Sequence, residues 1–354
     1  IRMTNRIIFL LIISLLLIII DLYIYKAVNA VYKNWTVKQR KVFRYSFWTY
    51  TILLTLAVFA SMFLNIRLSA KSVILVAFFL TFVSKIFFLL FLFTDDLRRG
   101  VIWIKRKLVP QNSDVATSPV KDNAIPRSEF LVKAGTLVAA LPLASLTYGM
   151  VSGAYDYRVI KRPLILPNLP ASFEGLTLGQ ISDVHSGSFY NRKAVLGGVE
   201  MLMAQKPDMI FFTGDLVNNL ASEMKDYQDI FAKVHAPLGV YSVLGNHDYG
   251  DYHFGPQPSA AKARNLEHVK LTHKNMGWNL LMNENRKIRI NNEEIAVIGI
   301  ENWGAGRFVR HGRMDLAVRN TDDQPVKLLL SHDPSHWRAQ VLKDYPQIDA
   351  MFSG

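Results

Sequence analysis

Long runs of apolar residues dominate the first 154 positions of this 354-residue chain. Three of them are 19 to 22 residues long, and a helix of that length spans about 30 Å, the thickness of a bilayer's hydrocarbon core. A fourth run contains Pro142, which membrane helices tolerate better than soluble helices do. We therefore expect a transmembrane region over 1–110, a linker over 111–130 and one further span. The predicted spans cover residues 7–25, 46–64, 72–93 and 131–152.

From residue 176 onward, short apolar runs of strand length alternate with amphipathic segments. The runs LTLGQIS, MIFFTGD, VYSVLGNHD, KLLLSHDP and IDAMFSG each predict a buried strand, and RKIRINNEEIAVIGIEN predicts a hairpin that turns at Asn291-Asn292. The segments NRKAVLGGVEMLMAQ and SEMKDYQDIFAKV predict helices. This alternation indicates an α/β domain over 153–354, and the hairpin makes its sheet mixed rather than wholly parallel.

Charge separates the same two parts of the chain. Residues 1–154 hold 19 of the 41 Lys and Arg and 6 of the 28 Asp and Glu, which leaves 22 of each sign in the remainder. The basic loops 26–45 and 94–133 lie on the same side of the predicted spans, and the positive-inside rule places them in the cytoplasm. We therefore expect a multi-pass protein of the cytoplasmic membrane with its α/β domain on the extracytoplasmic side.

Lys85 is the single charge inside the third predicted span. A lysine at such a position either pairs with a buried partner or lines a polar cavity, or it extends along the helix until its ammonium group reaches the interface. We expect the interfacial arrangement.

Asp, His and Asn residues, whose side chains can bind metal ions, follow the predicted strands. In open α/β sheets ligands bind beyond the carboxyl ends of strands, so these side chains are expected to converge. The chain has no cysteine, and oxygen and imidazole ligands without thiolates suit Mn, Fe or Zn. Two carboxylates, imidazoles and an amide exceed the needs of one catalytic metal. They fit two divalent ions, a pair that catalyses phosphoryl transfer. The residues are Asp183, His185, Asp215, Asn246, His247 and His332.

The motifs at these positions, in this order, resemble those of the calcineurin-like metallophosphoesterase superfamily, in its membrane-anchored bacterial form. The motifs are DVH at 183–185, GDLVN at 214–218, GNHD at 245–248 and SH at 331–332. The resemblance implies an αββα sandwich with mixed sheets and a hydrolase acting on phosphate esters, in which a hydroxide bridging two metals attacks phosphorus.

The resemblance also implies a role for each motif residue. His247 would contact the phosphate and protonate the leaving oxygen, and Asp248 would hold the His247 imidazole in the useful tautomer. The other five would bind metal: Asp183 and His185 the first ion, Asp215 both ions, Asn246 and His332 the second.

Two positions depart from the family pattern. Asn218 stands where the family commonly has Asp, and we expect this change to tune the loop rather than to remove a ligand. The family closes with Gly-His-x-His, whereas this sequence ends at Gly354. We therefore expect a fragment in which each metal lacks one histidine, so that metal binding is weak and activity nearly absent.

Three functions compete at this stage. The first is a membrane phosphoesterase whose substrate is a phospholipid or another lipid-linked envelope phosphate. The second is a membrane sensor or scaffold that keeps a degenerate phosphoesterase domain. The third is a nuclease, but the balanced charge of residues 155–354 argues against nucleic acid as a partner.

Overall fold

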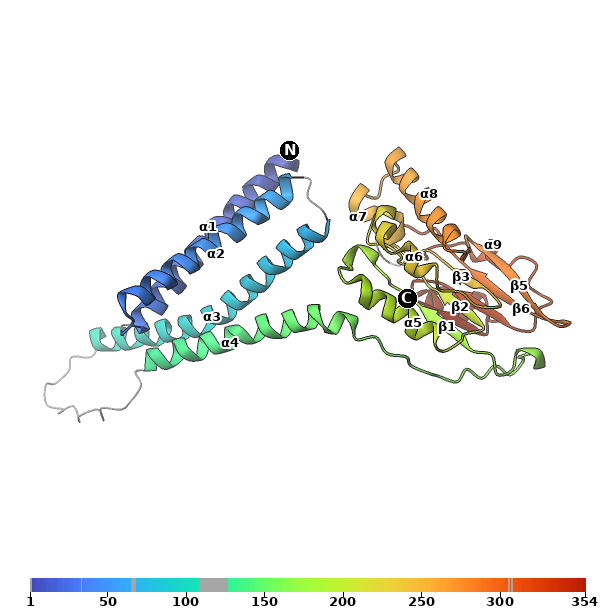
Figure 1. Ribbon diagram of the computed structural model, residues 1–354, viewed down its shortest axis with the longest axis horizontal. Helices are drawn as coiled ribbons and strands as arrows, with labels where there is room; N and C mark the ends of the chain where they lie inside the picture. The colour runs from blue at the N-terminus through green and yellow to red at the C-terminus, as the bar shows by residue number, and fades with distance from the viewer. Residues whose placement is uncertain (1, 33, 65–67, 109–126, 305, 307) are drawn as a thin grey trace. The chain divides into compact units, whose positions relative to one another are not determined.

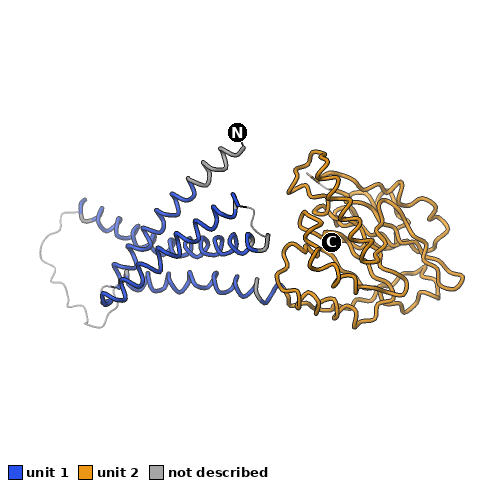
Figure 2. Tube along the Cα trace, turned by 45° about the horizontal axis from the view of Figure 1, so that its top comes forward, with its two compact units in different colours: residues 1–154 blue, residues 155–354 orange. Residues whose placement is uncertain are grey.

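Two units divide the chain between Ala154 and Tyr155. The computed structural model describes residues 2–32, 34–64, 68–108, 127–304, 306 and 308–354. Figure 2 shows a group of helices in the first unit and a folded domain in the second. Most of the predicted linker over 111–130 lies outside the described residues, and the helix that follows it begins at Arg127.

The described part of the first unit contains four α-helices, and all are long and apolar enough to cross a membrane. The helix α3 continues past its apolar run and includes the basic residues that follow it. The helices α3 and α4 lie close together at Gly135, where a Cβ atom would come within 2.9 Å of the Phe88 ring. Small residues allow such close approach between membrane helices. The bounds are α1 (Arg2–Val31), α2 (Val37–Phe63), α3 (Leu68–Leu108) and α4 (Arg127–Val151).

Lys85 forms a buried ion pair, and the expectation that it extends to an interface is wrong. Its Nζ atom lies 2.6 Å from Oδ1 of Asp21, a residue of α1 that is completely buried. A charge in an apolar surrounding is costly unless it has a counter-charge, so the two residues stabilise each other. Two residues later on α1, the Tyr23 hydroxyl donates to Asp96 of α3. Asp21 and Tyr23 of α1 therefore both contact α3.

Two four-stranded sheets form the second unit (Figure 1). The first sheet is wholly parallel, in the order β1-β2-β3-β4, with β1 (Leu178–Ile181), β2 (Met209–Phe212), β3 (Val240–Ser242) and β4 (Asn279–Leu280). The second sheet is mixed, because β5 (Glu284–Ile290) pairs antiparallel with β6 (Glu293–Gly299), while β7 (Lys327–Leu330) and β8 (Ala350–Phe352) continue it in parallel. The hairpin turns at Asn291-Asn292 as predicted.

The sheets pack face to face between two layers of helix, which confirms the predicted αββα sandwich. Successive side chains of a strand point to opposite faces. Phe211 of β2 therefore packs between the sheets with Val297 and Leu330, whereas its neighbours Ile210 and Phe212 pack under helices. The helices α5 (Arg192–Met203) and α8 (Ala260–Asn275) contribute to that outer core. The far face of the second sheet is covered by α9 (Met314–Ala317) and a π-helical turn (Trp337–Val341).

Some short elements differ from the sequence prediction. The predicted helix at SEMKDYQDIFAKV is a 3-10 segment (Ala221–Asp226) followed by the one-turn helix α6 (Gln228–Phe231). A cap begins the 3-10 segment, because the Glu223 carboxylate accepts the N–H groups of three preceding residues and fixes a tight turn there. The edge strand β4 and the helix α8 were not predicted. The remaining short helices are α7 (Asp251–Phe254) and α10 (Leu342–Asp344).

The buried ion pair gives a stability prediction for the helical unit. Asp21→Asn or Lys85→Met alone leaves one buried charge unpaired and is expected to cost about 3 kcal/mol, because removing one partner of a buried pair is strongly destabilising. The double variant Asp21→Leu/Lys85→Met should recover most of this loss. Thermal unfolding of the detergent-solubilised protein measures all three.

The pair Glu129–Lys133 serves as the matched control, because it is an exposed i,i+4 pair on α4. Lys133→Met should change stability by less than about 1 kcal/mol. A double variant at 21 and 85 that is no more stable than the single variants would show that the buried charges are not coupled.

Candidate metal centre

The polar residues that were predicted to converge all follow the carboxyl ends of strands. Three of these strands belong to the first sheet and β7 belongs to the second, so the candidate site draws on both sheets. This placement is the one in which open α/β sheets bind ligands. Asp183 and His185 follow β1, Asp215 follows β2, Asn246 and His247 follow β3, and His332 follows β7.

Three of these residues have left-handed backbone conformations. The φ angles of Asp183, His185 and Asp215 are 52°, 44° and 59°, values that residues other than glycine seldom adopt. Hydrogen bonds between the two loops hold them there: the Asp183 N–H donates to Gly214 O at 3.0 Å and the His185 N–H to Asp215 O at 3.1 Å. Backbone strain of this kind gathers at functional sites.

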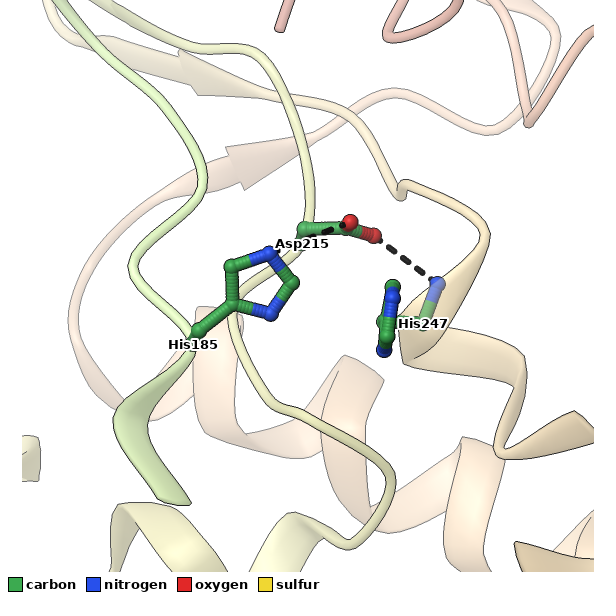
Figure 3. Close-up of side chains that lie close together, drawn as sticks. All are labelled: His185, Asp215 and His247. Carbon is green, nitrogen blue, oxygen red and sulfur yellow. Dashed lines mark hydrogen bonds and ion pairs between the residues drawn. The ribbon is translucent and has the colours of Figure 1, made fainter. Parts of the chain in front are cut away.

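Asp215 belongs to two groups of candidate ligands. One group joins it with His185 and His247, the other with Asp183 and His332, and within each group one ligand atom per residue lies within 4.8 Å of the others. Its Oδ2 atom lies 3.5 Å from His185 Nε2 and 3.3 Å from His332 Nε2. Figure 3 shows the Asp215 carboxylate between the rings of His185 and His247. Asp183 Oδ1 also lies 3.6 Å from His185 Nε2, and the assignment of these two residues to the same ion remains a prediction.

The charges of this cluster depend on one another. Burial opposes the protonation of His332, but the hydrogen bond and negative charge of Asp215, with help from Asp183, raise its pKa to about 9. A hydrogen bond with His185 lowers the pKa of Asp183, and the same bond raises the pKa of His185. The His332 imidazole therefore acts as a counter-cation of the carboxylates. A divalent cation supplies the same positive charge, and oxygen and imidazole donors fit such an ion.

His247 is oriented by a backbone carbonyl. Its Nδ1 atom lies 2.7 Å from Asn218 O, which makes Nδ1 the donor and leaves Nε2 for a ligand. Its own N–H donates to Asp215 Oδ1 at 2.8 Å. The side chain of Asn218 contacts the Ser188 hydroxyl instead of the cluster.

The structure corrects the role predicted for Asp248. Its carboxylate is completely buried and accepts hydrogen bonds from backbone N–H groups of both loops, rather than from the His247 ring. Burial and the charge of Asp215 raise its pKa to about 7, while the N–H groups act in the opposite direction. A buried carboxylate needs donors, and the loops supply them. The donors are Gly245 at 2.9 Å, Asp215 at 3.0 Å, Leu216 at 2.9 Å and Val217 at 3.2 Å.

Two glycines allow the backbone to approach the candidate ligands. A Cβ atom on Gly245 would lie 2.2 Å from Asp215 Oδ1, and one on Gly354 would lie 2.4 Å from His332 Nδ1. Any larger residue would displace these side chains. The ligand role of Asn246, which follows Gly245 at the start of a short 3-10 turn (His247–Tyr249), remains a prediction.

Sequence reasoning missed three contributors to the site. The Asn218 carbonyl and the Glu223 carboxylate act through the backbone of one loop, and no side-chain motif marks them. The third is Tyr252 of α7, whose half-exposed ring lies 4.6 Å from the His247 ring. An exposed aromatic four residues after GNHD is the one signal that the sequence offered for it.

Models of known protein families match both units of the chain. Residues 5–154 match the model of the transmembrane domain of a probable calcineurin-like phosphoesterase. Residues 176–354, half of the chain, match the calcineurin-like phosphoesterase model. The chain therefore belongs to the calcineurin-like phosphoesterase family.

Proteins similar to this chain include membrane and bacterial members of that family. A transmembrane protein with metallophosphoesterase domain from Danio rerio is 28% identical over 62% of this chain, which spans 49% of that protein. The uncharacterized metallophosphoesterase YkuE of Bacillus subtilis is 24% identical over 62% of this chain and 73% of its own length. The UDP-2,3-diacylglucosamine pyrophosphatase LpxG of Chlamydia trachomatis is 26% identical over 62% and 74%.

The raised pKa of His332 gives a prediction for metal binding. Near pH 7 this imidazole holds a proton in the metal-free protein, so a cation that binds it must displace that proton. Affinity for Mn²⁺ should therefore rise with pH up to about 9, by about tenfold per pH unit for each proton released. Calorimetric titration in two buffers of different ionisation enthalpy measures the release.

Two histidine variants test whether the proton release comes from the cluster or from elsewhere in the domain. His332→Gln should bind Mn²⁺ more weakly and release fewer protons. His311→Gln, at a half-buried histidine outside both groups, should leave the release unchanged. Equal proton release in wild type and His332→Gln would remove His332 from the set of ligands.

Proposed function

We propose that this protein is a metal-dependent phosphoesterase that hydrolyses a phosphate monoester or diester with two divalent ions. The proposal is carried by Asp215, a buried carboxylate that belongs to both groups of candidate ligands. A carboxylate in this position can bridge two cations. Its neighbours offer nitrogen and oxygen donors suited to Mn, Fe or Zn: Asp183, His185, Asn246 and His332.

Different residues of the chain have different roles in the proposed reaction. When bound, the divalent ions supply charge neutralisation for the phosphate and lower the pKa of a water molecule. The His247 N–H fixes Oδ1 of Asp215, which keeps Oδ2 toward the two candidate ligand histidines. Because the Asn218 carbonyl holds Nδ1 of His247, the Nε2 atom is the ring position that could donate a proton to the leaving oxygen.

The membrane helices and one relative favour a lipid-linked substrate. Four helices of the described chain can cross a bilayer, which keeps the domain near a membrane surface. The name of the Chlamydia relative describes a pyrophosphatase of UDP-2,3-diacylglucosamine, a lipid-bearing phosphate. Tyr252 adds an exposed aromatic surface beside His247, against which an apolar part of a substrate can pack. We therefore propose a phospholipid or another envelope-linked phosphate as substrate.

The proposal predicts a leaving-group effect at His247. The full-length protein with Mn²⁺ should hydrolyse p-nitrophenyl and phenyl phosphates, or the corresponding diesters. His247→Ala should lower kcat for the phenyl ester by about a hundredfold or more, because that leaving group needs a proton. The loss should be far smaller for p-nitrophenol, which leaves as an anion. Steady-state kinetics with both esters measures the difference.

Two further variants test the metal ligands under the same conditions. Asp215→Asn should lower kcat/KM by at least about a hundredfold for both esters. Asp229→Asn is the control, since Asp229 is an exposed acid paired with Arg192 outside the cluster. Absence of Mn²⁺-dependent hydrolysis in the full-length protein would favour a membrane sensor or scaffold with a degenerate domain.

We further propose that the protein lies in the cytoplasmic membrane with the phosphoesterase domain outside. The basic loops 26–45 and 94–133 support this orientation, whereas Arg158, Lys161 and Arg162 after the fourth span oppose it. An alkaline phosphatase fused after Ser152 should be active, because that enzyme requires the extracytoplasmic side. The same reporter fused after Leu108 should be inactive. The reverse pattern would place the domain in the cytoplasm.

A further inference from the structure

The segment that follows the fourth candidate span crosses the surface of the second unit in an extended form. Residues 156–165, all of which the structure describes, contain no helix or strand, and we call them the juxtamembrane segment. Tyr155 precedes it and accepts the N–H groups of Tyr190 and Asn191 on its hydroxyl oxygen, at 3.0 and 3.1 Å. Leu166 and Leu169 follow it and pack against the core between the sheets. Both ends are therefore fixed to the domain.

Between these anchors the segment exposes large apolar side chains. The exposed fractions are 43% for Val159, 75% for Ile160, 53% for Leu164 and 86% for Ile165. A single exposed aliphatic residue is ordinary on a protein surface, but four within seven residues are unusual, and concentrated apolar exposure marks interaction sites. Leu166, the next residue, packs against the core, whereas the four preceding apolar residues are exposed to solvent.

Cations alternate with the apolar residues of the segment. Arg158, Lys161 and Arg162 are all exposed, and the single acid, Asp156, pairs with Arg158 at 2.5 Å. Apolar side chains interleaved with lysine and arginine are typical of surfaces that lie in the headgroup region of a bilayer. The aliphatic stems of the cations can add to the apolar contact while their charged ends meet lipid phosphates.

The covalent chain keeps this segment close to the membrane. The fourth candidate span ends at Tyr155. Ile160 and Ile165 follow by five and ten residues, which an extended chain covers in at most about 18 and 36 Å. The segment therefore meets the bilayer surface at a high effective concentration. The three cations also stand where the positive-inside rule disfavours them for an extracytoplasmic domain, and lipid contact gives them a role of their own.

We propose that the juxtamembrane segment binds the headgroup region of the bilayer, with a preference for anionic lipids, and thereby holds the phosphoesterase unit against the membrane surface. The proposal rests on the membrane helices and on the exposed residues of the segment. It does not depend on the proposed hydrolysis, because catalysis could fail while the segment still binds lipid.

The absence of cysteine from the chain allows a direct test. The variant Ile165→Cys of this 354-residue chain carries an environment-sensitive fluorophore, and the protein is placed in nanodiscs of phosphatidylcholine alone or with phosphatidylglycerol. Lipids with a nitroxide in the headgroup should quench this label severalfold more than the same label at Leu342→Cys. Leu342 is the matched control, since it is an aliphatic residue of α10 with a 54% exposed side chain.

Charge variants test the lipid preference. Arg158→Gln/Lys161→Gln/Arg162→Gln should abolish the extra quenching that phosphatidylglycerol brings, while iodide in the water should reach the label at 165 more easily. Equal lipid quenching at 165 and 342 would overturn the proposal. So would a label at 165 that neither the nitroxide lipid nor iodide reaches, because protein would then cover the segment, from a second copy or from the helical unit.

Discussion

Four backbone N–H groups from two loops converge on the carboxylate of Asp248, and the geometry of the candidate metal centre depends on this convergence. Taking a carboxylate out of water is expensive unless donors replace the lost hydration. Here the donors are the amides that follow β2 and β3. The same bonds fix the peptide of Asp215 and the start of the turn that carries His247. Asp248, whose carboxylate accepts these backbone N–H groups, therefore helps to set the positions of Asp215 and His247.

The sheet topology explains why the sequence motifs could be interpreted at all. Parallel strands of one sheet bring their carboxyl ends together, so residues far apart in the chain, such as His185 and His247, meet without any local signal of contact. The motifs at the strand ends thus predicted which carboxylates and imidazoles lie close together. Their division between two ions remains a prediction, because it depends on side-chain rotation and on backbone acceptors. The Asn218 carbonyl that orients His247 has no signature in the amino-acid sequence.

In the helical unit, too, the sequence pattern predicted the elements but not the contacts between them. Apolar length alone predicted four spans, since the bilayer requires a run of about 20 residues. The partner of Lys85 could not be predicted in this way, because Asp21 lies on another helix and each residue looks like an isolated exception within its own run. In an apolar surrounding the two charges form one ion pair. This pair links α1 to α3 through a contact that the periodicity of either helix does not predict.

The left-handed backbone of Asp183, His185 and Asp215 has a consequence for the way this protein can change. Each of these positions would be relaxed by glycine, which adopts positive φ without strain. Selection for stability alone would therefore favour the loss of the residues that define the site. Aspartate and histidine at strained positions therefore cost the loops after β1 and β2 some stability. An engineered variant that gains heat resistance through glycine there would keep the sandwich and lose its centre.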